Sequence, residues 1–265
     1  MASHETVDLR VEGAAARLIL HRPDSLNAWN ERFGLDLRDA VESVAGDDSI
    51  RALLITGAGR AFSSGADLKE QRTDGEGGGL PDLSLRLREL YHPIITAIRE
   101  MPKPVIAAVN GPAVGIGCSL ALDCDLIYAA EASYFLLAFV NIGLVPDGGS
   151  TAILPARIGF ARATEMGMLG ERVPARQALE WGMVNRVCAD DELDAEAGAL
   201  LERLAAGPTR SYANFKTLLN RRVYTGLAEQ LEAEADAQRE QGHTRDFVEG
   251  VTAFVQKRPP EFTGG

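Results

Sequence analysis

The sequence has 265 residues, is 46% hydrophobic and carries a formal net charge of -11. This length and apolar content suffice for the core of one large domain, or of one domain with an appendage. The acidic balance repels nucleic acid and anionic membranes, so we expect neither as a partner.

Membrane insertion, secretion and metal binding are not expected either. No apolar run approaches the roughly 20 residues that a membrane helix needs. The N-terminal stretch MASHETVDLR has neither the basic nor the apolar region of a secretory signal. Cys118, Cys124 and Cys188 are scattered without metal-ligand spacing, which is the cysteine usage of a reduced cytoplasm. The sequence therefore predicts a cytoplasmic protein without a metal site.

Strand-like and helix-like segments alternate along the first half of the chain. Residues 17–23 form a strand-like run that ends in a turn, and apolar residues at helical spacing follow within 33–44. Further apolar, strand-like runs occupy 51–59, 103–111 and 124–130. Continuous apolar strands alternating with helices predict an α/β protein whose parallel sheet is buried on both faces.

Two later segments differ from this alternation. Residues 71–82 are polar and rich in glycine, which fits either a surface loop or a lid over an active site. From about Asp191 onward the patterns are helical only. We therefore divide the chain into a core of residues 1–200 and a helical C-terminal region of residues 201–265.

Two glycine-containing loops each follow a predicted strand. In GRAFSSGADLKE (59–70), Gly65 gives the backbone freedom, and Asp67 is placed to cap a short helix. In NGPAVGIGCSLALDCD (110–125), Gly115 and Gly117 precede an apolar, helix-like run. Neither loop has the spacing of a phosphate-binding motif. Each one alone also fits a tight turn between a strand and a helix.

The two loops together suggest a function for their backbone amides. The first residues of a helix leave N–H groups without partners, so the amides of Ala66 and Ile116 are available to a polar ligand. Paired backbone donors of this kind form an oxyanion hole, which stabilises negative charge on a carbonyl oxygen.

Both loops resemble signature segments of the crotonase superfamily, the enoyl-CoA hydratases and isomerases. Four further segments match in the same order: RPDSLNAWN (22–30), GLVPDGG (143–149), ALEWGMVNRV (178–187) and EGVTAFVQKRPPEF (249–262). The resemblance covers essentially the whole chain. Within the superfamily the sequence is most similar to the ring-epoxide (1,2-epoxyphenylacetyl-CoA) isomerases of phenylacetyl-CoA breakdown.

The resemblance implies a ClpP-like spiral of repeated ββα units with a helical C-terminal region for trimerisation. The expected assembly is a homotrimer or a dimer of trimers. The expected substrate is an acyl-CoA, and coenzyme A enters as part of that thioester, so no separate cofactor is expected. The thioester oxygen would lie between the amides of Ala66 and Ile116. Relatives usually have glycine at position 116, so the isoleucine side chain must find room.

The resemblance also implies a set of residues that contact the substrate. These residues are Leu26, Ala28, Gly65, Asp67, Leu68, Lys69, Gly115, Ser119, Phe139, Phe254 and Lys257. Lys69 and Lys257 would bind the phosphates of coenzyme A, and Phe254 would reach the adenine pocket of a neighbouring subunit. Alternatively, Lys69 and Lys257 are solvated surface cations, and Phe254 is a packed aromatic side chain.

Asp147 is the expected acid/base group. Hydratases of this superfamily use two glutamates, and the matching positions here are Ser119 and Phe139, neither of which ionises near neutral pH. In the isomerases that the sequence resembles, the aspartate of the Pro-Asp-x-Gly corner moves the proton, and that position is Asp147. The apolar residues before it would raise the pKa of its carboxyl by desolvation. Alternatively, Asp147 is the N-cap of the helix that follows.

The remaining candidate residues allow more than one interpretation. Tyr91 and His92 either line the acyl pocket or begin a helix, and Asp123 and Asp125 are expected as caps or ion-pair partners. We therefore predict an acyl-CoA isomerase with catalytic residues Asp147, Ala66 and Ile116. Its alternatives are an enoyl-CoA hydratase and a catalytically silent acyl-CoA-binding homologue.

A serine hydrolase is a further rival, because Clp-type proteases share this fold. Such an enzyme needs Ser, His and Asp in one cluster. Ser63, Ser64 and Ser119 are available, but none of the four histidines lies in a hydrolase motif.

Overall fold

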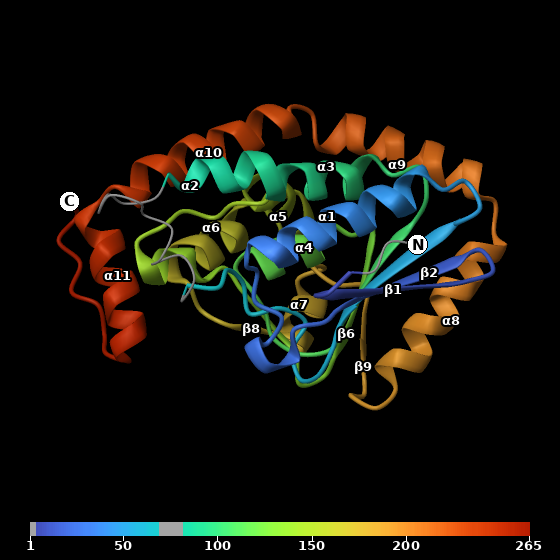
Figure 1. The fold of residues 1–265 in the computed structure, drawn as a ribbon, viewed down its shortest axis with the longest axis horizontal. Helices are drawn as coiled ribbons and strands as arrows, with labels where there is room; N and C mark the ends of the chain where they lie inside the picture. The colour runs from blue at the N-terminus through green and yellow to red at the C-terminus, as the bar shows by residue number, and fades with distance from the viewer. Residues whose placement is uncertain (1–3, 69–81) are drawn as a thin grey trace.

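The computed structural model describes residues 4–68 and 82–265, and its centre is a six-stranded sheet (Figure 1). The strand order is β1-β2-β3-β4-β6-β9. β1 and β2 form an antiparallel hairpin, and every later neighbour is parallel. The strands are β1 (Val7–Glu12), β2 (Ala15–Leu20), β3 (Ala52–Gly57), β4 (Val105–Val109), β6 (Leu126–Ala130) and β9 (Arg186–Cys188). A smaller sheet has the order β5-β7-β8, with β5 (Ala113–Val114), β7 (Tyr134–Leu136) and β8 (Val173–Pro174).

Helices cover both faces of the large sheet, as the apolar strand patterns predict. In β3, Leu53 and Ile55 belong to a core on one side, while Ala52 and Leu54 belong to a core on the other. This alternation follows from the two-residue period of a strand. The first core packs against α1 (Glu31–Gly46), α3 (His92–Glu100) and α4 (Ile116–Asp123), and the second packs against α8 (Leu193–Ala206). The expectation of a sheet buried on both faces is confirmed.

The other helices complete the molecule. They are η1 (Pro23–Ser25), α2 (Leu83–Arg86), the π-helical segment η2 (Leu87–Tyr91), η3 (Ala138–Ile142), α5 (Ser150–Ile158), α6 (Phe160–Leu169), α7 (Ala175–Glu180), α9 (Thr209–Val223), α10 (Leu227–Gly242) and α11 (Arg245–Gln256). Among the described residues, none of these helices is both long and apolar enough to cross a membrane.

The C-terminal part of the chain is helical from α8 onward, as expected. In Figure 1, α9 and α10 run one after the other along the side of the molecule that carries α2 and α3. α10 contacts both α2 and α5. Residue 200, where we divided the chain, lies inside α8 rather than between two elements, and the division into two regions stays a prediction.

Candidate active site

The two glycine-containing loops lie side by side and touch through their backbones. Ser63 pairs with Ala113 in a parallel bridge, and the Val114 N–H donates to the Ser63 carbonyl at 2.9 Å. Gly65 has a φ of +90°, and a Cβ atom on it would lie 2.9 Å from the Val114 carbonyl oxygen. Only glycine combines this backbone conformation with so close an approach. Gly65 and Gly115 therefore hold the loops against each other.

One backbone amide follows each of these glycines and makes no hydrogen bond within residues 4–68 and 82–265. Ala66 forms a bridge with Trp29, but the bridge uses the Gly65 carbonyl and the Asp67 N–H, so the Ala66 N–H takes no part. Ile116 is the first residue of α4, where N–H groups have no partner within the helix. The two amides singled out from the sequence are therefore both available to a ligand.

The segment with Leu26 and Ala28 is anchored beside the first loop. The Ser64 N–H donates to the Leu26 carbonyl at 2.9 Å. The Arg22 guanidinium donates to the Ala28 carbonyl at 2.5 Å and contacts the Asp67 carboxylate at 3.2 Å. Leu26 has a left-handed φ of 55°, a strained conformation that such side chains rarely adopt. The structure thus brings Leu26, Ala28 and Asp67 to the loop that carries Ala66. Leu68 is the last described residue before a gap, and Lys69 lies outside the described residues.

Asp147 is buried at the corner between η3 and α5, with 5% of its surface exposed. Its Oδ2 accepts a hydrogen bond of 3.1 Å from Nε2 of Gln238, on α10. Its Oδ1 is buried without a hydrogen-bond partner among the described residues. Burial raises the pKa of this carboxyl well above its ordinary value, and the nearby Glu234 carboxylate raises it further, while the Gln238 hydrogen bond lowers it. Such a carboxyl is suited to accept and return protons.

The interpretation of Asp147 as the N-cap of the next helix is wrong. α5 begins at Ser150, and its N-cap is Gly149, which has no side chain to bond to the helix. The carboxylate that binds this helix end is Glu234, on α10, which accepts from the N–H groups of Gly149 at 2.8 Å and Thr151 at 3.0 Å. Sequence reasoning missed Glu234 because it lies in a strongly charged segment that resembles a solvated helix.

Ser119 and Ile116 pack directly against the Asp147 corner. The Ser119 hydroxyl donates to the Asp147 carbonyl oxygen at 2.8 Å. Gly148 has a φ of +64°, and a Cβ atom on it would lie 2.6 Å from Cδ1 of Ile116. The missing side chain of Gly148 therefore provides the room that the isoleucine needs. Phe139 approaches the second loop, with its Cζ 3.8 Å from where a Cβ atom on Gly115 would lie.

Tyr91 lies close enough to Asp147 for the charge of that carboxylate to affect its hydroxyl, whereas His92 faces α10. The Tyr91 ring packs edge-on against Trp29 with centroids 5.1 Å apart. Burial raises the pKa of the Tyr91 hydroxyl, and the charge of Asp147 raises it further. α3 follows η2 without a break, so His92 lies within a continuous helical run and does not begin a helix as one interpretation held; its Nδ1 lies 3.5 Å from Glu232. Burial lowers the pKa of His92.

The two aspartates after α4 differ. Asp125 is the expected ion-pair partner and cap, because it binds Nζ of Lys216 at 2.8 Å and accepts from the Val105 N–H at 2.9 Å. Asp123 is fully buried, and neither of its carboxyl oxygens has a hydrogen-bond partner among the described residues. The expectation of a cap or ion-pair partner is wrong for Asp123.

Phe254 and Lys257 lie at the far end of the chain. Phe254 is on α11, which packs on η3 and α10, and its side chain is exposed. Lys257 follows α11 as its C-cap, with a left-handed φ of 56°. The structure of one subunit does not bring either residue to the amide loops, and their roles in substrate binding stay predictions.

The candidate hydrolase serines hold the loops together instead of forming a catalytic cluster. The Ser63 hydroxyl accepts from the Trp29 indole N–H at 3.1 Å and donates to the Asn27 carbonyl at 2.9 Å. The hydroxyl of Ser119 donates to Asp147, and that of Ser64 donates to the Ser25 carbonyl at 3.3 Å. All three hydroxyls have backbone partners, which argues against a serine hydrolase.

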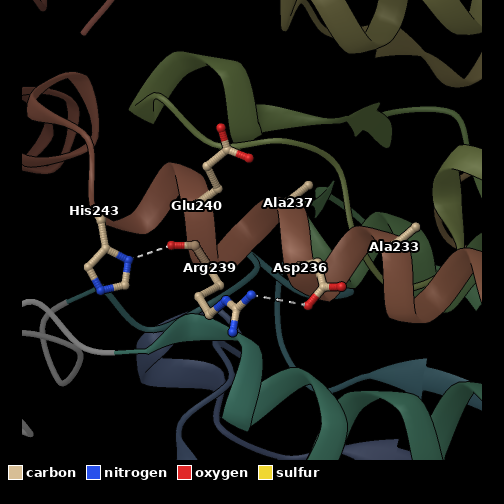
Figure 2. A pocket seen from close by; sticks show the side chains of 6 residues that line it. All are labelled: Ala233, Asp236, Ala237, Arg239, Glu240 and His243. Carbon is tan, nitrogen blue, oxygen red and sulfur yellow. Dashed lines mark hydrogen bonds and ion pairs between the residues drawn. The ribbon is translucent and has the colours of Figure 1, made fainter.

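A pocket of about 690 Å³ lies over the outer face of α10 (Figure 2). Its lining residues are Ala233, Asp236, Ala237, Arg239, Glu240 and His243. None of the residues predicted from the sequence lines it, so this pocket is separate from the amide loops. In the described part of the chain, no three His, Cys, Asp or Glu side chains gather where they could hold a metal ion.

Comparisons with known proteins agree with the architecture. The family described as Enoyl-CoA hydratase/isomerase matches residues 10–265. The 1,2-epoxyphenylacetyl-CoA isomerase of Escherichia coli is 42% identical over 254 residues, which are 96% of this chain and 97% of that protein. A probable enoyl-CoA hydratase of Rhodobacter capsulatus is 40% identical, with 99% of each chain covered. The crystal structure of an enoyl-CoA hydratase from Mycobacterium avium subsp. paratuberculosis has a TM-score of 0.88 at 39% identity, and the match covers 98% of this chain and 100% of that chain.

Fold and relatives together define the class of this protein as that of the α/β hydratases and isomerases. The chain belongs to the enoyl-CoA hydratase/isomerase family and has the crotonase fold. The resemblance seen in the sequence is thereby confirmed.

Proposed function

We propose that the protein is an acyl-CoA isomerase in which Asp147 moves one proton along the acyl group. The observation that carries this proposal is that a buried carboxyl with a raised pKa and one unpartnered oxygen lies at a corner that packs against Ser119 and Ile116 of the second loop. To shift a double bond from C3 to C2, Asp147 removes a proton from C2, and the electrons delocalise onto the thioester oxygen. The protonated carboxyl then returns the proton to C4. One carboxyl serves both positions, so atoms and charge balance without another reactant.

The amides of Ala66 and Ile116 are the proposed donors to the thioester oxygen. Both follow glycines that touch each other, and neither N–H is used elsewhere in the described residues. Charge on the oxygen develops only when the enolate forms, so preorganised donors lower the barrier to that step. Removal of one donor from an oxyanion hole typically costs about 3–4 kcal/mol of barrier.

Ser119 and Phe139 argue against efficient hydration. The addition of water requires a group that activates it, yet the Ser119 hydroxyl is bonded to the Asp147 carbonyl and Phe139 is apolar and buried. Hydration is the second candidate activity, because one relative is named as a probable enoyl-CoA hydratase. A catalytically silent acyl-CoA-binding protein is the third candidate.

The acyl group, the assembly and the location belong to the same proposal. The natural substrate is a 3-enoyl-CoA or a ring-epoxide acyl-CoA, since a relative at 42% identity is named for the latter. Exposed apolar side chains on α6 and α9, among them Phe160, Met168, Phe215 and Leu218, support assembly into a trimer or a dimer of trimers.

Three free, buried cysteines suit the cytoplasm. Proton transfer to an enolate requires no metal or redox cofactor.

The test compares two reactions in wild type and Asp147→Asn. We expect wild type to isomerise a 3-enoyl-CoA to its 2-enoyl form and to hydrate crotonyl-CoA negligibly. Asp147→Asn keeps the shape of the side chain and should lose roughly 100- to 10,000-fold of the isomerase rate. An active Asp147→Asn variant, or brisk hydration by wild type, would show that the proposed base or the proposed reaction is wrong. Normal thioester binding without turnover of any substrate would instead favour a silent binding protein.

A further inference from the structure

α10 buries two polar side chains on the face that meets the Asp147 corner. Glu234 and Gln238 are four residues apart, and their exposed fractions are 3% and 1%. Residues at this spacing lie on the same face of a helix. A buried carboxylate and a buried amide are unfavourable unless hydrogen bonds compensate for the lost water. Their partners therefore indicate why this helix has polar residues where apolar ones would pack.

Gln238 binds the corner at two points. Its Nε2 donates to the Val145 carbonyl at 2.6 Å and to Oδ2 of Asp147 at 3.1 Å. A primary amide has two N–H hydrogens, and both have an acceptor here, whereas Oε1 of Gln238 is buried without a hydrogen-bond partner among the described residues. The backbone before Asp147 and the carboxyl itself are thus held by the same nitrogen.

This bond makes the two oxygens of Asp147 unequal. Oδ2 is held by Gln238, whereas Oδ1 has no hydrogen-bond partner among the described residues. Oδ1 therefore keeps its full capacity to accept a proton, whereas Oδ2 already accepts a hydrogen bond. Glu234 has a different role. It accepts hydrogen bonds from the N–H groups of Gly149 and Thr151 and makes none with the Asp147 side chain. Glu234 fixes the loop after the aspartate, and Gln238 fixes the aspartate.

We propose that Gln238 is a positioning residue that holds Oδ2 of Asp147 and thereby presents Oδ1 to the substrate. This inference rests on the proposed function, since it assigns Gln238 a part in proton transfer by Asp147. The titratable groups near the carboxyl are Glu234 and Tyr91. Gln238 itself does not titrate, so its replacement acts on Asp147 without adding or removing a charge.

Gln238→Met tests the proposal, because methionine has a similar length and donates no hydrogen bond. Gln241→Met is the matched control: Gln241 follows on the same helix, is half-buried, and its side chain makes no hydrogen bond among the described residues. We expect Gln238→Met to lower kcat for 3-enoyl-CoA isomerisation about 10- to 100-fold, as a misplaced catalytic group does. KM should stay within about threefold, because thioester binding is unchanged.

The pH profile separates positioning from a merely structural role. The Gln238 hydrogen bond lowers the pKa of Asp147, so Gln238→Met should move the acid limb of kcat/KM to higher pH. A loss of folded protein would scale the whole profile without moving the limb. Wild-type kcat with an unmoved acid limb in Gln238→Met would overturn the proposal.

Two more variants keep the test decisive. If circular dichroism shows that Gln238→Met does not fold, Gln238→Leu replaces it, since leucine also donates no hydrogen bond and adds no charge beside Asp147. That variant should also move the acid limb to higher pH, and an unchanged kcat and limb would overturn the proposal. Asp147→Asn is measured alongside. If Asp147→Asn stays active, the proposed function fails; if it is inactive while Gln238→Met behaves as wild type, only the role of Gln238 fails.

Discussion

The Ser119 hydroxyl donates a hydrogen bond of 2.8 Å to the carbonyl oxygen of Asp147. A residue of α4, the helix that begins with the Ile116 amide, therefore holds the backbone of the corner that carries the proposed base. The bond is buried, so no water can replace it. Ser119 thus links the helix that begins at Ile116 directly to the Asp147 corner.

Ser119→Ala should weaken this connection. We expect a loss of about 1 kcal/mol in the free energy of unfolding, because a typical buried hydrogen bond contributes that much. Urea denaturation of wild type and variant measures it. Thr217→Ala is a control, since the Thr217 hydroxyl bonds to the Ala213 carbonyl in an exposed position. An equal loss in both variants would contradict a special role for the Ser119 bond.

Gly148→Ala should clash with the isoleucine of the second loop. The added Cβ would lie 2.6 Å from Cδ1 of Ile116, at a φ of +64°. We expect a loss of about 1–3 kcal/mol in the free energy of unfolding. Ile116→Val removes Cδ1, so the double variant should recover part of the loss, and a double-mutant cycle measures the coupling. Strict additivity of the two changes would show that the side chains do not compete for this space.

Glu234→Gln should shift the pH dependence of catalysis. The Glu234 charge raises the pKa of Asp147. A neutral side chain at this position therefore lowers that pKa, and the acid limb of kcat/KM should move to lower pH, opposite to the shift expected for Gln238→Met. Profiles of kcat/KM against pH measure both directions. Glu232→Gln is the control, because Glu232 is exposed and pairs with Arg88. A shift to higher pH would contradict the electrostatic role of Glu234.

Asp147→Asn should make the protein more stable at neutral and alkaline pH. The ordinary value for this carboxyl is 3.8, and the folded state raises its pKa well above that. The folded state therefore binds more protons than the unfolded state between the two values. The contribution of Asp147 to the stability of the fold is fully present below its pKa in the unfolded state. This contribution is lost as the pH rises through its pKa in the folded state. Asparagine does not titrate, so the difference in unfolding free energy should grow with pH, as chemical denaturation at pH 5 and pH 8 can show.

Asp123→Asn is the matched variant for that measurement. Its carboxyl is also fully buried with a raised pKa, so the same growth of stability with pH is expected. Asp123 lies outside the proposed machinery, and its variant should keep isomerase activity. A decrease in stability for Asp147→Asn at pH 8 would contradict a raised pKa in the folded state.

The sequence predicted the central strands, both amide loops and the Asp147 corner, because those features are local. Gly65 and Gly115 each follow a strand-like run, so the local sequence alone was enough to place both in turns. β1 was not predicted although it has six residues, and the short strands β5, β7, β8 and β9 were missed because two or three residues carry too little periodicity. Glu234 and Gln238 were also missed. Their partners lie more than 80 residues earlier in the chain, and nothing in an acidic helical pattern indicates which of its polar residues is buried.

The contacts of α10 with the corner also set the order in which the chemistry is acquired during synthesis. The amide loops are complete once residue 123 has emerged, but Gln238 is translated 91 positions after Asp147. Until then Oδ2 of Asp147 lacks the hydrogen bond from Gln238 that distinguishes its two oxygens. A chain that ends before α10 therefore contains both amide loops and the Asp147 corner but lacks the two side chains, Glu234 and Gln238, that bind this corner.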